Sequence, residues 1–354
     1  MDKIIECVPN FSEGNDMAII NQILHEIRSV SNVKVINTDP GKDTNRTVIT
    51  FVGEPEAVCK AAFLAVKKAA EIIDMSKQKG RHPRIGATDV LPLIPVKGVS
   101  MEETVEFATN LGKRIGEELN IPGYFYEFAA TEEKRRNLAN CRSGEYEGLT
   151  QKLANPEWKP DFGPAEFNEH VRKTGATVVG ARNFLIAYNV NLNTNSTHIA
   201  NIIASEIREK GRIKREGDPN TGEVIKDNNG NLIYEPGLLK SVKGIGWYIE
   251  EYGIAQLSFN ITNISTASIH QVFELACERA LAHGVQVTGS ELIGTIPLQA
   301  LLDAGNYYLQ KMHQPTNVSD EVKLITAIKS MGLDELAPFD LKMRIIDYLI
   351  QDIS

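Results

Sequence analysis

The stretch Lys-Gly-Arg-His-Pro-Arg-Ile-Gly-Ala-Thr-Asp, residues 79–89, separates two long segments with regular apolar spacing. It holds one imidazole (His82), two guanidinium groups (Arg81 and Arg84), a carboxylate (Asp89) and two glycines. The proline that follows the histidine fixes the backbone there, because its ring restricts φ. Connections that hold charged groups on a rigid scaffold commonly carry function. We therefore expect a binding or catalytic loop here, with the flanking elements as its support.

The elements around this loop follow a recognisable order. Apolar periodicity predicts, in turn, a strand at 3–8, a helix at 16–30, strands at 33–39 and 46–52, a helix at 55–75 and a strand at 90–96. Pro40-Gly41 should end the second strand, and Pro92 and Pro95 place the last one at a sheet edge, where a missing N–H costs nothing. The order is β-α-β-β-α-β, the split ferredoxin-like unit.

The same order recurs in the second half. It comprises strands at 183–192, 246–251, 255–262 and 285–288, helices at 196–210 and 265–283, and a polar hairpin at 211–240. We interpret this as a duplication whose halves meet near 176–182, an arrangement that favours a ligand site at the junction. The predicted fold is therefore α/β (α+β), with two ferredoxin-like subdomains, a groove between them and a helical C-terminal tail. The expected boundaries are 1–180, 181–312 and 313–354.

The connection between the two halves is expected to be less regular. Ser100 and Glu103 form a capping box for a helix at 100–119, and a strand should follow at 124–130. Residues 141–175 look irregular, and their aromatic side chains Trp158, Phe162 and Phe167 should pin them to a core.

Composition excludes several classes of protein. The chain has 354 residues, which favours two cores, because one core usually stops growing at about 250 to 300 residues. No apolar run reaches the ~20 residues of a membrane helix, and the N-terminus lacks a secretory pattern, so we expect a cytoplasmic protein without membrane partners. The net charge of −8 argues against nucleic-acid binding. The four cysteines are widely spaced and are expected to be buried thiols.

Common cofactor motifs are missing from the sequence. There is no phosphate-binding Gly-x-x-x-x-Gly-Lys-Ser/Thr loop, and the glycines at 244 and 246 lack the third glycine of a dinucleotide fingerprint. The seven histidines never occur as His-x-His or His-x-x-x-His, so we predict no metal site.

Three groups of residues are candidates for chemistry, and each also has an ordinary explanation. His82 can act as a general acid or base, or it can merely cap or pack. Asp39 and Asp43, close to Asn45 and Arg46, can stabilise a substrate cation, or they can be turn residues that bind backbone amides. The glycine-rich segment 163–182 can be a linker, or a backbone surface against which a flat ring lies closely. The residues alone indicate a two-domain α/β enzyme of unknown substrate.

Four longer stretches resemble the formiminotransferase family, in the stand-alone form without a cyclodeaminase domain. They are residues 6–14 (Glu-Cys-Val-Pro-Asn-Phe-Ser-Glu-Gly), 44–48 (Thr-Asn-Arg-Thr-Val), 82–90 (His-Pro-Arg-Ile-Gly-Ala-Thr-Asp-Val) and 180–189 (Gly-Ala-Arg-Asn-Phe-Leu-Ile-Ala-Tyr-Asn). The resemblance covers about residues 3–312. It implies transfer of a formimidoyl group from N-formimidoyl-L-glutamate to N5 of tetrahydrofolate in histidine degradation, by an enzyme that is a homodimer.

The resemblance also implies roles for individual residues. His82 corresponds to the catalytic histidine, and the segment from Gly163 corresponds to the folate-binding stretch. By charge we assign Asp39 to the cationic formimidoyl nitrogen and Arg46 or Arg84 to substrate carboxylates. The remaining substrate-binding candidates are Asn10, Asn45, Gly163, Pro164, Gly175, Ala176 and Arg182.

Two alternatives stay open. One is a folate-dependent transferase with another one-carbon donor, such as 5-formyltetrahydrofolate. The other is a folate-binding subunit without catalysis, against which the presence of His82 and its flanking arginines argues.

Overall fold

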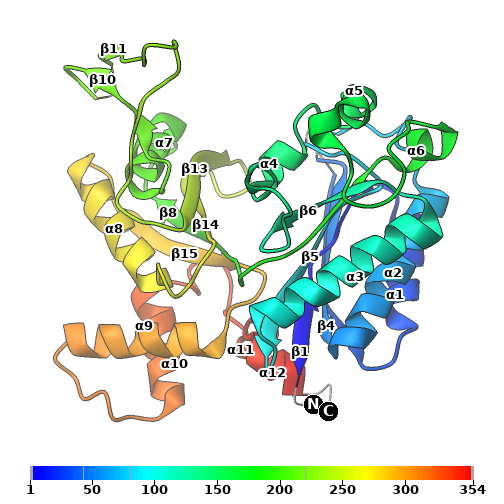
Figure 1. Cartoon of the computed structure of the whole chain (residues 1–354). Coiled ribbons are helices and arrows are strands. Elements are labelled where there is room, and N and C mark those ends of the chain that lie inside the picture. Colours follow the sequence, from blue (N-terminus) through cyan, green and yellow to red (C-terminus); the bar gives the residue numbers. More distant parts are fainter. Residues whose placement is uncertain (1–2, 43, 81, 220, 352–354) are drawn as a thin grey trace. The chain divides into compact units, whose positions relative to one another are not determined.

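The computed structural model describes residues 3–42, 44–80, 82–219 and 221–351. The chain divides into two compact units, one formed by Met1–Asn183 with Ile350–Ser354 and the other by Phe184–Leu349. Each contains mixed sheet and helix, as Figure 1 shows. Within the described residues, no helix is both long and apolar enough to cross a membrane.

The first unit is built on a seven-stranded sheet. Its strands are β1 (Ile4–Cys7), β2 (Asn10–Phe11), β3 (Val33–Gly41), β4 (Arg46–Gly53), β5 (Thr88–Lys97), β6 (Gly123–Glu127) and β7 (Thr177–Ala181). Across the sheet β3 pairs with β4, β4 with β1 and β2, and both of these with β5. All these pairs are antiparallel, which is the predicted split β-α-β arrangement. Parallel pairing with β7, and of β7 with β6, extends the sheet beyond β5.

Helices cover both faces of this sheet. On one face lie α1 (Met17–Arg28), α2 (Pro55–Ile72) and α3 (Met101–Leu119), whose apolar stripes join the sheet in the larger core. The capping box of Ser100 and Glu103 begins α3 as predicted. A smaller core on the opposite face involves α4 (Leu138–Cys141), α5 (Leu149–Ala154) and α6 (Glu169–Thr174), with Trp158 and Phe167 packed against it. Phe162 is buried in the larger core instead. The short 3₁₀ helices Glu133–Arg135 and Pro156–Trp158 complete this segment.

The position predicted for the proline-containing strand is wrong. β5 is central, because β1 and β2 pair with it on one side and β7 on the other. Its two prolines are tolerated for local reasons. Pro95 lies opposite Ile5 beside a register shift, and Pro92 faces the interruption between β1 and β2, where its carbonyl accepts from the Val8 amide at 3.3 Å. Prolines inside sheets are confined to such irregular points when they are not at an edge.

Two further differences concern strand bounds. β3 continues through Pro40 and Gly41, since it is an edge strand that, among the described residues, pairs with β4 alone. β7 was not predicted as a strand, because Thr177-Val178-Val179-Gly180-Ala181 is short, contains a glycine and follows another glycine. It nevertheless forms the parallel link between β5 and β6.

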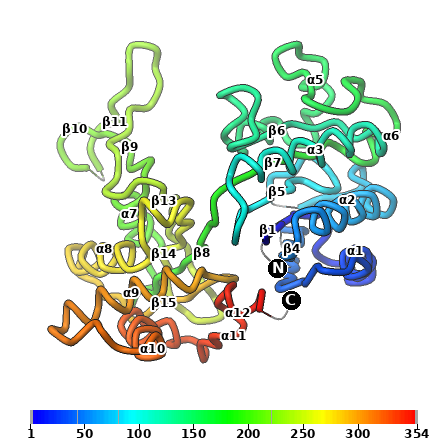
Figure 2. The backbone as a smooth tube through the Cα atoms, turned by 60° about the horizontal axis from the view of Figure 1, so that its bottom comes forward, coloured from blue at the N-terminus to red at the C-terminus, as the bar shows by residue number. Residues whose placement is uncertain are grey.

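The second unit repeats the predicted order. Its main elements are β8 (Ile186–Leu192), α7 (Thr197–Ile207), β13 (Val242–Ile249), β14 (Ile254–Ile261), α8 (Ile269–Ala282) and β15 (Val287–Ile293). The sheet order β13-β14-β8-β15 is the split β-α-β order again, with α7 and α8 packed on one face. The polar segment between α7 and β13 carries two small ladders, formed by β9 (Arg212–Ile213), β10 (Arg215–Glu216), β11 (Glu223–Val224) and β12 (Tyr234–Glu235). Figure 2 shows this segment extending away from α7.

The C-terminal helices complete this second unit. They are α9 (Leu298–Lys311), α10 (Asp320–Met331), α11 (Leu341–Arg344) and α12 (Ile346–Gln351). Buried side chains of α10, including Leu324 and Met331, belong to the same core as the sheet. α9 and α10 approach so closely that a Cβ on Gly305 would lie 2.2 Å from the carbonyl oxygen of Lys323. The segment that we expected as a helical tail thus packs, up to Leu349, with the second unit.

Candidate functional site

The loop that carries His82 connects α2 to β5 and is held by neighbouring backbone. The amide of Met75 donates to the carbonyl of Lys173 at 2.9 Å, and the amide of Ala87 donates to the carbonyl of Thr174 at 2.8 Å. Gly86 lies so close to the next segment that a Cβ there would be 2.1 Å from the carbonyl oxygen of Ala176. The loop is therefore fixed on both sides of His82 before any ligand binds.

His82 contacts a guanidinium that belongs to a neighbouring strand. Arg46, the first residue of β4, has its Nη1 2.8 Å from the His82 Nε2 and 2.8 Å from the Asn10 Oδ1 of β2. An arginine can only donate, so the His82 Nε2 accepts this hydrogen bond and the ring proton of the neutral imidazole lies on Nδ1. Among the described residues, the His82 Nδ1 has no hydrogen-bond partner.

This environment keeps the imidazole neutral. Burial, together with the positive charges of Arg46 and Arg142, lowers the pKa of His82 to about 4. At neutral pH the ring is unprotonated, which is the form that a general base requires.

Asp39 lies on β3 at the edge of the same site. It pairs with Val48, two residues along β4 from Arg46, so the side chains of Asp39 and Arg46 project from the same face of the sheet. Burial lowers the pKa of Arg46, whereas the carboxylates of Asp89 and Asp39 oppose this change. Asp39 is exposed, so a cation can reach its carboxylate.

The side chain of Asn45 holds the backbone of the loop in place. Its Nδ2 donates to the carbonyl of Lys79 at 2.8 Å, and its Oδ1 accepts from the Gly14 amide at 3.0 Å and from the Asn15 side chain at 2.8 Å. These bonds use the amide group that we expected to bind substrate. Asn45 is thus a positioning residue for the loop in this structure.

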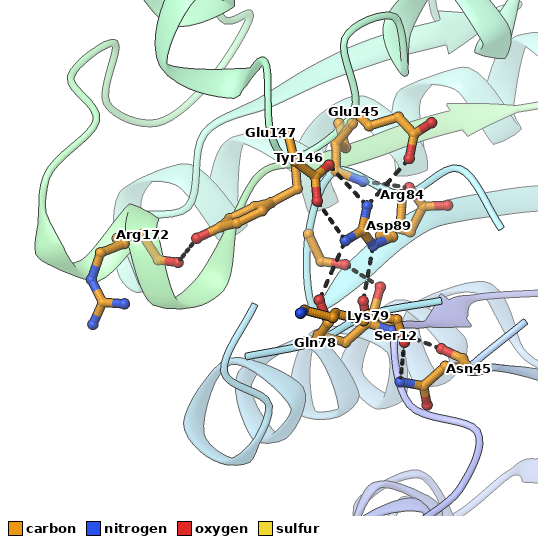
Figure 3. A network of polar contacts seen from close by, with 12 residues as sticks. Ser12, Asn45, Gln78, Lys79, Arg84, Asp89, Glu145, Tyr146, Glu147 and Arg172 are labelled. Atoms are coloured by element: carbon orange, nitrogen blue, oxygen red, sulfur yellow. Dashed lines mark hydrogen bonds and ion pairs between the residues drawn. The ribbon is translucent and has the colours of Figure 1, made fainter. Parts of the chain in front are cut away.

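Arg84 forms a clasp with two glutamates, which Figure 3 shows. Its Nη1 and Nη2 donate to Glu147 at 3.0 and 2.8 Å, and Nη1 also donates to Glu145 at 3.2 Å. The Nε and Nη2 groups bind the side chain and the carbonyl of Gln78 at 2.9 and 3.3 Å. A guanidinium has five N–H donors, and these five bonds occupy them all. The expectation that Arg84 binds a substrate carboxylate is therefore corrected: it joins the loop to residues 145–147, beside an open cavity of about 530 Å³.

Arg142 enters the site although no motif singles it out in the sequence. It follows α4, and its Nη2 contacts the buried Asp89 Oδ2. The other oxygen of Asp89 accepts from the amide of Ile85 at 3.0 Å, in the same loop as His82. The one sequence signal was a basic residue before the turn-forming pair Ser143-Gly144, inside a segment expected to be irregular.

The glycine-rich candidates separate into two groups. Gly175 and Ala176 are buried, and a Cβ on Gly175 would lie 2.2 Å from the carbonyl oxygen of Ile85. The chain's own backbone fills the space beside these two residues. This corrects the expectation that they form an open surface for a flat ring. Gly163 is exposed, with Pro164 beside it half-buried, and both stay candidates for binding.

Arg182 follows β7 and lies close to a buried carboxylate. Its amide donates to the carbonyl of Leu93 at 3.0 Å, and its charge partly offsets the effect of burial on the pKa of Glu6. Arg81 and Asp43, which the sequence also singled out, lie outside the described residues. The structure thus joins His82, Arg46 and Asn10 directly and adds Asp39, Asp89 and Arg142 through charge and contact.

Two family models match most of the chain. The family model described as "Formiminotransferase domain, N-terminal subdomain" matches residues 4–182. The family model described as "Formiminotransferase domain" matches residues 187–351. The chain belongs to the formiminotransferase family.

Relatives in this family are similar over most of the chain. The formimidoyltransferase-cyclodeaminase of Dictyostelium discoideum is 45% identical over 352 residues, which cover 99% of this chain and 61% of the relative. The chain thus spans about three fifths of that protein. The glutamate formimidoyltransferases of Thermoplasma acidophilum and Streptococcus pyogenes serotype M1 are 42% and 40% identical. The matched regions cover 87% and 88% of this chain and 92% and 94% of those relatives. In the described part of the chain, no three His, Cys, Asp or Glu side chains converge in a group that could hold a metal ion.

Proposed function

We propose that this chain is a glutamate formimidoyltransferase, which transfers the formimidoyl group of N-formimidoyl-L-glutamate to N5 of tetrahydrofolate. The observation that carries the proposal is the neutral imidazole of His82, held by the Arg46–Asn10 pair in a member of the formiminotransferase family. Relatives named glutamate formimidoyltransferase, similar along nearly their whole length, support the reaction. Tetrahydrofolate is then a co-substrate, and no metal takes part.

The proposed chemistry needs one group that takes a proton and returns it. N5 of tetrahydrofolate attacks the formimidoyl carbon and a new C–N bond forms. The N5 proton passes to the Nε2 of His82, which Arg46 must first release because Nδ1 already carries a proton. The tetrahedral intermediate collapses when the glutamate nitrogen receives that proton, the old C–N bond breaks, and 5-formimidoyltetrahydrofolate and glutamate are released. Such a group typically contributes a factor of about 10² to 10⁴ in rate.

Two charged residues complete the assignment. Asp39 is exposed at the site and can stabilise the positive formimidoyl group, and Arg46 can hold a substrate carboxylate. Gly163 and Pro164 are proposed folate contacts, since Gly163 is exposed and Pro164 half-buried at the start of the stretch that resembles the folate-binding segment.

A coupled assay tests the proposal. The chain is incubated with tetrahydrofolate and N-formimidoylglutamate, the reaction is quenched with acid, and the absorbance of the methenyl derivative is read. His82→Ala should lose about 10² to 10⁴ of the rate while it keeps the wild-type circular dichroism. His25→Ala, in an exposed position on α1, is the matched control and should keep full activity.

The same assay separates the alternatives. If the wild type binds tetrahydrofolate but forms no product from N-formimidoylglutamate, the donor assignment is wrong. Turnover with 5-formyltetrahydrofolate and glutamate would then identify the other transferase, and no turnover with either donor would identify a binding subunit.

We also propose a cytoplasmic homodimer without membrane or nucleic-acid partners. Four free thiols, two of them buried, suit a reducing compartment. The net charge of −8 disfavours nucleic acid. Dimerisation follows from the family resemblance, and light scattering at several protein concentrations would test it.

A further inference from the structure

The backbone around Arg142 is held by a buried lysine. The ammonium group of Lys152 donates to the carbonyls of Asn140, Cys141 and Ser143 at 3.0, 2.7 and 3.1 Å, on both sides of Arg142. Lys152 is only 7% exposed, and its charge lies over the ring of Trp158 at 4.0 Å from the centroid. A buried ammonium group is costly unless acceptors surround it, so these contacts fix the chain at this point.

The side chain of Arg142 is held just as firmly. It is 15% exposed, and its Nη2 contacts Asp89, which is 1% exposed. Asp89 also binds the amide of Ile85 in the His82 loop. One carboxylate thus ties the guanidinium of Arg142 to the loop that carries the candidate base.

Two guanidinium groups act together in this site. Arg46 and Arg142 act on each other, and both act on His82 and on the buried carboxylate of Asp89, whereas the exposed carboxylate of Asp39 acts on Arg46. Among the described residues, the Nε atoms of Arg46 and Arg142 and the Nδ1 of His82 are buried without a hydrogen-bond partner. Buried donors are normally satisfied, so these three atoms leave hydrogen-bonding capacity that a bound anion can meet.

We infer that Arg142 is a substrate-binding residue that, together with Arg46, holds one carboxylate of the formimidoyl donor. The inference rests on the proposed function, because N-formimidoylglutamate supplies the carboxylates. Asp89 and Lys152 are then positioning residues that set the guanidinium in place.

Kinetics separate this role from a structural one. Arg142→Gln should raise KM for N-formimidoylglutamate by about 10- to 100-fold, the loss of a charge-assisted hydrogen bond, and leave KM for tetrahydrofolate within about twofold. Arg142→Lys should recover part of the loss. Arg136→Gln is the control, because Arg136 lies in the same segment, is exposed, and pairs with Glu133 on the surface. Equal changes in both KM values, or unchanged KM values with lower thermal stability, would overturn the inference.

A binding measurement keeps this test separate from that of the proposed function. L-glutamate, the product, should shift the imidazole resonances of His82 in the wild type and in Arg136→Gln, but not in Arg142→Gln. If the wild type proves inactive with N-formimidoylglutamate, the proposed function fails. The glutamate titration still tests whether Arg142 binds a carboxylate. Equal shifts in all three proteins would refute its role.

Discussion

Arg46 donates through Nη1 to the Nε2 of His82 at 2.8 Å, so a permanent positive charge touches the candidate base. Because the guanidinium cannot accept a proton, this contact selects the neutral imidazole and fixes its tautomer. The strand pairing that places Arg46 beside Asn10 thereby sets the protonation state of a residue in a different loop.

Removing this charge should raise the pKa of His82. In Arg46→Gln we expect it to move from about 4 toward the ordinary value near 6.5, though not fully, because burial and Arg142 still act on it. Two-dimensional NMR of the histidine rings as a function of pH measures this, with His82→Gln to assign the resonance. An unchanged pKa would mean that burial and Arg142 keep the ring neutral without Arg46.

The clasp around Arg84 should contribute to stability in a way that lysine cannot reproduce. Arg84→Lys loses the fork that reaches Gln78, Glu145 and Glu147, and we expect the free energy of unfolding to fall by about 2 to 3 kcal/mol. Urea denaturation measures the change. Arg172→Lys is the control, because its pair with Glu169 is exposed and screened by solvent, so its loss should lower the free energy of unfolding much less. Similar losses in both variants would contradict a special role for the clasp.

The order of elements was predictable because it depends on local patterns. Apolar periods of 2 and 3.6 residues, with caps such as Ser100–Glu103, place each strand and helix near its observed bounds. The same local reasoning put the strand with Pro92 and Pro95 at an edge, because nothing in its own sequence shows that its partners are interrupted at the matching positions.

The composition of the site was only partly predictable. His82, Arg46 and Asp39 stand beside turn residues, which draws attention to them. Arg142 acts through a tertiary contact with Asp89, far away in the chain, and Lys152 through backbone carbonyls that its own helix does not contain. The donors of Arg84 are occupied by residues that include a glutamate of another segment. Sequence spacing carries no information about such pairings.

Close backbone contact at Gly175 should make it intolerant of any side chain. Gly175 has φ +68°, and a Cβ would lie 2.2 Å from the carbonyl oxygen of Ile85, so Gly175→Ala should cost about 2 to 4 kcal/mol in the free energy of unfolding. Gly144 has φ +83°, but a Cβ there would meet its nearest atom at 3.5 Å. Gly144→Ala should therefore cost only about 1 kcal/mol, the conformational part alone. Equal costs, measured by urea denaturation, would show that the loop gives way to the added methyl group.

Glu6 should make the stability depend on pH. Burial raises its pKa from 4.5 to about 7, and Arg182 offsets part of this rise, so the folded chain binds the proton more tightly than the unfolded chain. The stabilisation is complete below about pH 4.5 and is lost as the pH rises through about 7, by up to about 3 kcal/mol.

The variant Glu6→Gln should flatten that dependence. It should be more stable than the wild type at pH 8 and should lose the fall in unfolding free energy between pH 5 and 8. Glu117→Gln, in an exposed position on α3, should keep the wild-type profile. Parallel profiles for the wild type and Glu6→Gln would show that another group causes the dependence.

The first unit draws its site from Asn10, Arg46, His82 and Arg142, which meet only after strands distant in the chain have paired. Contacts of large sequence separation form slowly, since the chain must close long loops before they stabilise it. During refolding from urea, helix content should therefore return before activity does. Recovery of catalysis would report the last step of folding, and a variant that slows the docking of residues 142–148 would delay activity without changing the early phases.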